Sequence, residues 1–259
     1  MFSELPECIF DYENVIVACP HCGKENIYNR VSDLKTIKWV SSFSANCMHC
    51  GKIIPLSGDF INPAYQMILY KTYRHKEAKE YMQSIITICT AYEMLFMFTL
   101  RLFLTIKPLK NFEFSYQRIE PNKRLNEALE HKVETFAFRK MLNEFIKVII
   151  RNDSCPIETL EASEDYIANM NGNPTNVESI RQIKDKSLRN QLVVLYKLKE
   201  KNLLIDSIRN KVVHKQGYRP SLEEVEREIT IARNIIFKIT GILHLITDDV
   251  VVYYEMHSQ

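Results

Sequence analysis

Residues 19–23 read Cys19-Pro20-His21-Cys22-Gly23, and residues 47–51 repeat the pattern as Cys47-Met48-His49-Cys50-Gly51. Two residues between paired cysteines let both thiolates turn toward one ion, and the following glycine permits a positive φ. Two such knuckles supply four thiolates in a tetrahedron, the ligand set of a structural Zn²⁺. The intervening sequence has strand character at Ile27-Tyr28 and at 36–40. The pattern therefore predicts a small β-rich zinc ribbon over residues 1–60, with Cys19, Cys22, Cys47 and Cys50 as metal ligands.

Four cysteine ligands leave no open coordination position, so the zinc is expected to be structural, and no catalytic metal is expected. The alternative is a coincidental pair of reducing Cys-x-x-Cys motifs. His21 and His49 are either competing ligands or, as we expect, solvated side chains. The remaining cysteines have no partner at metal-binding spacing and are expected to be reduced, incidental thiols: Cys8, Cys89 and Cys155.

The rest of the chain has a helical pattern. Only 6 Gly and 9 Pro occur in 259 residues, which favours long helices over a sandwich or barrel. Pro55, Gly58 and Pro63 predict a boundary near residue 60. The predicted fold is mainly α, a helical bundle over residues 61–259 preceded by the ribbon.

Helices are expected over 63–106, as one helix or a pair, over 121–150 and over 177–214, as one or more. A short helix is expected between Pro156 and Gly172. Ser221 and Glu224 have capping-box spacing, which predicts a final helix from that point to about residue 246. Residues 250–254 are β-prone and form either a terminal strand or a packing tail.

Charge and hydropathy indicate the partners and the cellular location that the chain can have. Residues 1–60 carry 5 basic and 7 acidic residues, and residues 61–259 carry 29 and 25, so the helical part is mildly basic. The apolar stretch 81–106 is interrupted by Glu93 and Arg101, which predicts a buried core helix and no membrane span. Residues 1–7 are acidic and lack the apolar core of a signal peptide, so a cytoplasmic location is expected.

One segment carries the residue types of a catalytic site. Residues 203–215 contain Arg209-Asn210, three further residues, and then His214. The segment ends a predicted helix, and an acidic amphipathic helix follows it from Ser221. Upstream, Ala91-Tyr92-Glu93-Met94-Leu95-Phe96 is similar in pattern to an early bundle helix. Together these features resemble the HEPN family, over about residues 75–246.

The resemblance implies a helical domain that acts as a homodimer and, in many members, a metal-independent endoribonuclease. Arg209 and His214 would be catalytic, with Asn210 as an orienting residue. It also implies a prokaryotic toxin or antiviral-defence effector that cuts RNA, with an antitoxin or defence-system protein as a further partner. The other functions open to such a chain are a non-catalytic dimerisation module that binds nucleic acid or protein, and a partner of a nucleotidyltransferase.

The chemistry of these residue types agrees with RNA cleavage. RNA carries its own nucleophile, the 2′-OH, so a protein must supply proton transfer, for which His is suited, and charge stabilisation on phosphate, for which Arg is suited. At 100° per residue, Asn210 and His214 share a helix face, whereas Arg209 lies about 140° from His214. A two-fold dimer relieves this by joining Arg from one subunit to His from the other. Nearby residues expected to bind substrate are Lys211, Lys215, Tyr218 and Arg219.

Simpler interpretations compete with each of these assignments. In the simplest one, Arg209 is either a surface residue or a salt-bridging residue with Asp206 as a candidate partner, and His214 is a C-terminal helix cap. Glu93 orients Arg209, pairs with Arg101 or extends to solvent. Arg124 and His131 also have the family's Arg–His spacing. Two further stretches are either surface and loop packing or RNA contacts: the basic run over 181–201 and the aromatic and basic residues over 112–124.

Overall fold

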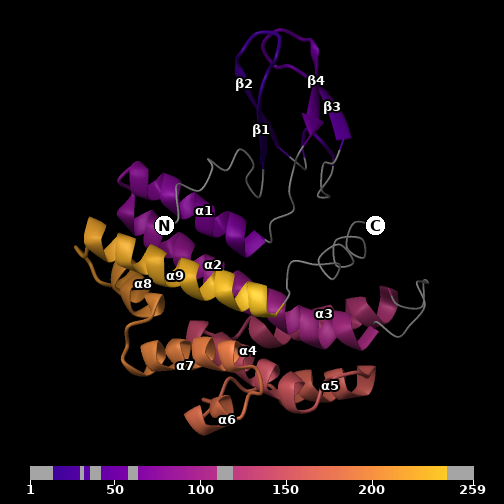
Figure 1. Cartoon of the computed structure of the whole chain (residues 1–259), viewed down its shortest axis with the longest axis vertical. Helices are drawn as coiled ribbons and strands as arrows, with labels where there is room; N and C mark the ends of the chain where they lie inside the picture. Colours follow the sequence, from indigo (N-terminus) through magenta and orange to yellow (C-terminus); the bar gives the residue numbers. More distant parts are fainter. Residues whose placement is uncertain (1–13, 30–31, 36–41, 58–63, 110–118, 244–259) are drawn as a thin grey trace.

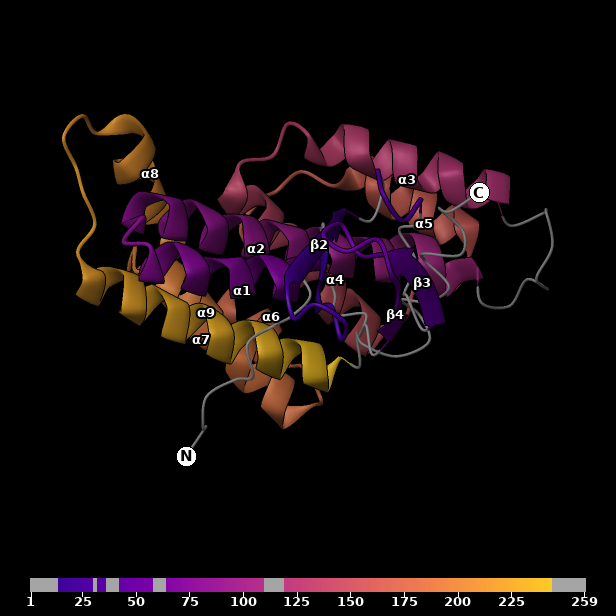
Figure 2. The same ribbon diagram turned by 90° about the horizontal axis from the view of Figure 1, so that it is seen from above.

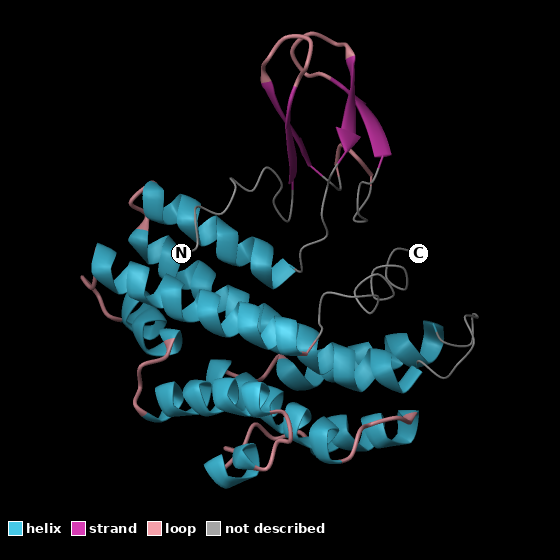
Figure 3. Cartoon of the chain, in the orientation of Figure 1, coloured by secondary structure: helices cyan, strands magenta, loops and turns pink. Residues whose placement is uncertain are grey.

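The computed structural model describes residues 14–29, 32–35, 42–57, 64–109 and 119–243. Within these ranges the chain is mainly helical, with short strands confined to its N-terminal part (Figure 3). The mainly α class is thereby confirmed. Buried apolar side chains form two separate clusters, one among the strands and one among the helices. The predicted boundary at residue 60 lies outside the described residues.

The N-terminal part consists of two antiparallel hairpins. Strand β1 (Asn14–Ala18) pairs with β2 (Glu25–Asn29), and β3 (Ser42–Asn46) pairs with β4 (Ile53–Ser57). Each Cys-x-x-Cys-Gly motif forms the turn of one hairpin, so the two motifs lie at corresponding ends (Figure 1). The strand character of Ile27-Tyr28 is confirmed in β2, and the strand predicted at 36–40 lies outside the described residues.

The predicted helical stretch 63–106 is a pair of antiparallel helices, α1 (Ala64–Glu77) and α2 (Tyr81–Arg101). The chain reverses where Lys79 has a φ of 60° and the Glu80 amide donates to the His75 carbonyl at 2.8 Å. Figures 1 and 2 show α1, α2 and α9 (Leu222–Ile242) lying side by side. Helix α2 also packs on α4 (Phe138–Ser154) and α8 (Ile205–His214), so it is the core helix that its apolar sequence predicts.

Helix α2 passes directly into a π-helical turn, η1 (Leu102–Ile106), and a 3-10 turn, η2 (Lys107–Leu109). A π turn frees backbone carbonyls from the regular α-helical bonding pattern. The Thr105 carbonyl accepts a hydrogen bond of 2.8 Å from the side chain of Asn122, which in turn is held by the Asn126 amide at 2.7 Å. These asparagines lie in α3 (Ile119–Val133), so the irregular turn fixes α3 against α2.

The prediction of one helix over 121–150 is wrong, because α3 ends at Val133 and α4 begins at Phe138. No Gly or Pro marks the break; instead Ala137 is extended, with ψ of 160°. The restart places Phe138 against Phe96 of α2, with ring centroids 5.5 Å apart and an edge-on geometry. Tertiary packing of the aromatic core therefore overrides the apolar periodicity that runs through the break.

The C-terminal half contains shorter helices: α5 (Leu160–Asn169), α6 (Val177–Arg181), α7 (Lys186–Glu200) and α8. The stretch 177–214 is thus three helices. The capping box at the start of α9 is confirmed, since the Ser221 hydroxyl accepts from the Glu224 amide and the Glu224 carboxylate accepts from the Ser221 amide. Residues 244–246, expected to extend α9, and the β-prone tail at 250–254 lie outside the described residues.

Candidate functional site

The four cysteines of the two knuckles converge on one point. Their Sγ atoms all lie within 4.8 Å of one another, with Cys19 to Cys50 at 3.8 Å and Cys22 to Cys47 at 3.7 Å. A tetrahedron of thiolates about 2.3 Å from a zinc ion has edges of about 3.8 Å. Separations of this size are too long for a disulfide, whose sulfurs lie about 2.05 Å apart. The thiols therefore form a site that fits a tetrahedral metal ion.

The backbone of the two knuckles is the same. In each, the glycine amide donates to the carbonyl of the first cysteine, Gly23 to Cys19 at 2.8 Å and Gly51 to Cys47 at 2.9 Å. Gly23 and Gly51 have φ of 70° and 72°, the region that glycine adopts without strain. The amides two residues after Cys19 and Cys47 point at their sulfurs at 3.4 Å, which stabilises thiolate charge.

The hairpins are joined by hydrogen bonds beside this site. The Tyr28 hydroxyl donates to the Asn46 carbonyl at 2.9 Å, and the Met48 amide donates to the Asn26 side chain at 2.8 Å. Burial, followed by the charge of neighbouring thiolates, raises the pKa of Tyr28 and keeps its hydroxyl a donor. His49 Nε2 lies 2.9 Å from the Glu25 carbonyl, which gives this imidazole a structural partner outside the sulfur cluster.

The second candidate site is on α8. Ile205, Asp206, Ile208 and Val212 face the core, while Asn210, Val213 and His214 face solvent and Arg209 is half-buried. One Arg209 guanidinium nitrogen lies 3.3 Å from the Asn210 side-chain oxygen. His214 is the last residue of α8, and its imidazole makes no hydrogen bond or ion pair with the part of the chain that is described. The motif thus combines a partly sheltered guanidinium with an accessible imidazole.

Asp206 is held by a residue that the sequence did not suggest. Its Oδ2 atom accepts a 2.6 Å hydrogen bond from Arg139 Nε on α4, and the carboxylate is only 6% exposed. Arg139 also donates to Asn202 at 2.8 Å, so it ties α4 to both ends of the turn that precedes α8. The alternative in which Arg209 forms a salt bridge to Asp206 is not observed among the described residues, where Asp206 pairs with Arg139.

The charge of Arg209 instead acts on Glu93 of α2, although the two side chains form no ion pair or hydrogen bond with each other. Burial raises the pKa of Glu93, and the positive charge of Arg209 and a hydrogen bond from Cys89 partly oppose that rise. The Cys89 thiol lies 3.9 Å from Glu93 Oε1 and is itself buried, which raises its pKa as well. Arg101, the other partner considered for Glu93, pairs with Glu130 of α3. Of the interpretations of Glu93, the structure favours the one in which it faces Arg209.

The residues expected to bind substrate surround the end of α8. Lys211 lies over the Tyr218 ring, 5.7 Å from its centroid, so one face of that ring is already covered. The Tyr218 hydroxyl donates to Glu224 at 2.9 Å, and burial followed by this bond raises the pKa of Tyr218 to about 12. Arg219 donates to the Tyr218 carbonyl at 2.8 Å, and Lys215 is exposed. Tyr218 is thus an anchored loop residue, and the cations lie around it.

The competing candidates are engaged in local contacts. Arg124 pairs with Glu164 of α5 at 2.6 Å, and His131 pairs with Glu134 one turn away at 3.9 Å. In the basic run over 181–201, Arg181 pairs with Glu178 and Lys199 is buried against Asn143. The aromatic and basic stretch 112–124 lies mostly outside the described residues. These observations favour packing and surface pairing for the Arg124–His131 pair and for much of the basic run.

Comparisons with known proteins assign neither a family nor a function to the chain. No family model matches the chain, and neither characterised proteins nor solved structures gave a match.

Proposed function

We propose that the chain is a metal-independent endoribonuclease of the HEPN type, active as a homodimer, with Arg209, Asn210 and His214 in its site. The observation that carries the proposal is the pairing of two environments on α8: His214 is solvent-facing and unengaged within the described chain, while Arg209 is half-buried opposite the Glu93 carboxylate. A half-buried guanidinium that also lies 3.3 Å from the Asn210 side-chain oxygen presents its remaining donors without a large further loss of side-chain freedom.

The reaction that these groups support is internal transesterification of RNA. The 2′-oxygen attacks the adjacent phosphorus, a 2′-oxygen–phosphorus bond forms, and the bond from phosphorus to the 5′-oxygen breaks. The imidazole of His214 accepts the 2′-OH proton and a protonated imidazole returns a proton to the 5′-oxygen, so protons balance. The guanidinium of Arg209 stabilises the phosphate as its charge grows. The products are a 2′,3′-cyclic phosphate and a 5′-hydroxyl.

In the proposed dimer, two copies of the chain meet at α8. Arg209 and His214 diverge by about 140° around one helix, so two copies meeting at this helix bring unlike groups together. Val213 lies between them in sequence and is 48% exposed, which supplies an apolar contact for the second copy. Cations for the RNA backbone are Lys211, Lys215 and Arg219 around the same helix end.

In this proposal the metal of the ribbon is zinc and its role is structural. Four soft thiolates in tetrahedral array suit Zn²⁺, and they leave no position for water or substrate. The ribbon is then the part of the chain that binds RNA or a protein partner, such as an antitoxin or another component of a defence system. A cytoplasmic toxin or defence effector is the biological setting that we propose.

A cleavage assay tests the function directly. Purified protein is incubated with RNA in EDTA, with metal analysis confirming that the ribbon keeps its ion, beside His214→Ala and Arg209→Ala. The matched controls are His131→Ala and Arg124→Ala, which remove the other pair with the same spacing. We expect cleavage in the parent and the controls and a loss of about 10²–10⁴-fold in the two α8 variants. Equal cleavage by His214→Ala and the parent would contradict the proposal.

A second experiment tests the shared site. The two α8 variants are coexpressed with different tags, and the mixed dimer is purified through both tags. If each site takes Arg209 from one subunit and His214 from the other, one of the two sites is intact, so about half of the parental activity returns. A mixed dimer as inactive as either variant alone would contradict a shared site. No cleavage by the parent on any RNA would instead favour the non-catalytic binding module.

A further inference from the structure

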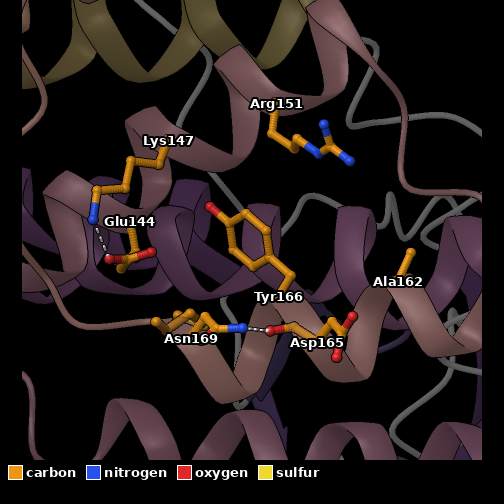
Figure 4. Close-up of a pocket in the computed structure, with 8 residues that line it drawn as sticks. Glu144, Lys147, Arg151, Ala162, Asp165, Tyr166 and Asn169 are labelled. Carbon is orange, nitrogen blue, oxygen red and sulfur yellow. Dashed lines mark hydrogen bonds and ion pairs between the residues drawn. The ribbon is translucent and has the colours of Figure 1, made fainter.

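A cavity of about 410 Å³ lies between α4 and α5, away from both sites described above. Figure 4 shows Lys147 and Arg151 of α4 on one side, and Asp165, Tyr166 and Asn169 of α5 on the other. The two sets recur at helical spacing on facing sides of their helices, and Ala162 and Met170 add apolar lining between them. Its volume falls in the range of sites that hold small molecules.

The hydroxyl of Tyr166 lies within the wall of this cavity without a hydrogen-bond partner in the described part of the chain. The oxygen is buried and has no hydrogen bond within the described part of the chain. Buried hydroxyls of this kind are uncommon, because removing a polar group from water without a partner costs free energy. In Figure 4 the hydroxyl end of the ring lies between Lys147 and Arg151. Because this oxygen has almost no accessible surface, a ligand atom would accept a hydrogen bond from it only after a neighbouring side chain moves aside.

Two cations add further donors. Lys147 Nζ donates to Glu144 at 2.8 Å and to Asn171 at 3.0 Å, which leaves one of its three N–H groups free. The guanidinium of Arg151 is exposed and makes no hydrogen bond or ion pair with described residues. The deep wall therefore offers donors from three side chains to an acceptor-rich ligand. Glu144 accepts both the Lys147 ammonium and the Gly172 amide, the latter at 2.8 Å, through Oε1, so its carboxylate is a second negative group at the cavity beside Asp165.

We propose that this cavity binds a small organic oxyanion, with its phosphate or carboxylate group on Arg151 and Lys147 and one oxygen accepting from the Tyr166 hydroxyl. Asp165 is exposed at the cavity and opposes the negative charge, which limits affinity. The site is independent of the proposed RNA chemistry, since α5 and α8 lie toward opposite ends of the helical part in Figures 1 and 2.

Calorimetric titration of the full chain with AMP, succinate and inorganic phosphate tests the proposal. We expect one saturable site per chain for AMP or for succinate; the one that binds tells whether the oxyanion is a phosphate ester or a carboxylate. Tyr166→Phe removes only the unpartnered oxygen, and Arg151→Gln only the charge, so each is expected to weaken binding about tenfold. Asp165→Asn is expected to strengthen binding about threefold.

The matched control is Lys197→Gln, which removes an exposed cation of α7 that does not line the cavity and leaves binding unchanged. The proposal is overturned if neither organic anion binds, if inorganic phosphate alone binds, or if Tyr166→Phe and Arg151→Gln bind as the parent does. Circular dichroism of each variant separates a lost donor from a lost fold. RNA cleavage by the same variants is expected to be unchanged, so failure here leaves the proposed ribonuclease function untouched.

Discussion

The ribbon and the helical part reach a stable fold by opposite means. The described core of the ribbon is small and includes two of its own metal ligands: Val15, Cys19, Tyr28, Leu34, Cys47, Ile54 and Leu56. The helical part is built around α2, whose buried face is covered by α1, α4, α8 and α9. A small core leaves too little apolar burial to offset chain entropy, so we expect the ribbon to depend on an ion bound by its four cysteines, whereas the helices depend on packing.

The largest effect expected from this difference is on the ribbon alone. If the four cysteines hold a structural zinc, removal of the metal with a strong chelator should delete binding free energy of about 10–16 kcal/mol, and Cys47→Ala, which removes one of the four ligands, a large part of it; either change should unfold the hairpins. Metal analysis should find about one zinc per chain in the parent. Cys155→Ala, at an exposed cysteine outside the cluster, is the control and should keep the metal. A ribbon that keeps its NMR chemical shifts without metal would contradict the comparison.

The next largest effect is expected from a substitution in the aromatic core of the helical part, which should leave the ribbon intact. Phe96 is fully buried, and its ring centroid lies 4.8 Å from Phe145 and 5.5 Å from Phe138. Phe96→Ala is expected to lower the free energy of unfolding of the helical part by about 3–5 kcal/mol, through lost burial and the cavity that remains. The zinc content should not change. Urea denaturation followed by far-UV circular dichroism, with metal analysis in parallel, measures both; metal loss in this variant would show that the two parts fold together.

An intermediate effect is expected at the contact between α4 and α8. Arg139→Ala leaves the buried Asp206 carboxylate without its partner, and we expect a loss of about 1–3 kcal/mol. Arg124→Ala is the matched control, because its pair with Glu164 is exposed on both sides and should contribute only about 0–1 kcal/mol. Chemical denaturation compares them. Equal values for the two variants would remove the argument that Arg139 holds α8 in place.

The smallest effect concerns pH. Burial raises the pKa of Glu93. At pH values between its unfolded and its folded pKa, the folded state therefore binds more protons than the unfolded state. The contribution of Glu93 is therefore most favourable below its unfolded pKa and is lost as pH rises toward the higher folded value. Glu93→Gln should flatten the fall of unfolding free energy over that window. Denaturation at a series of pH values measures the slope, with the surface substitution Glu223→Gln as control; an unchanged slope would contradict a buried, ionisable Glu93.

The sequence predicted best where a feature is local. The cysteine spacing and the capping box of α9 involve residues close in sequence, and both are present as expected. The break between α3 and α4 was missed because it is set by where Phe138 meets Phe96, and no local residue marks it. Arg139 was missed for the same reason, since it lies 67 residues from Asp206 in sequence and its charge alone does not identify a partner. The cavity beside Tyr166 likewise arises from how α4 and α5 face each other.

Glu224 serves two neighbours with one carboxylate. Oε2 accepts the Ser221 amide at 2.9 Å and Oε1 accepts the Tyr218 hydroxyl at 2.9 Å, and the amide bond is the main reason that its pKa is lowered. The loop that follows His214 is thereby tethered, through Tyr218, to the first turn of α9. Acidification below that lowered pKa, or substitution of this single side chain, would release the tether from both ends at once. We therefore expect the C-terminal end of α8, at His214, and the start of α9 to move together.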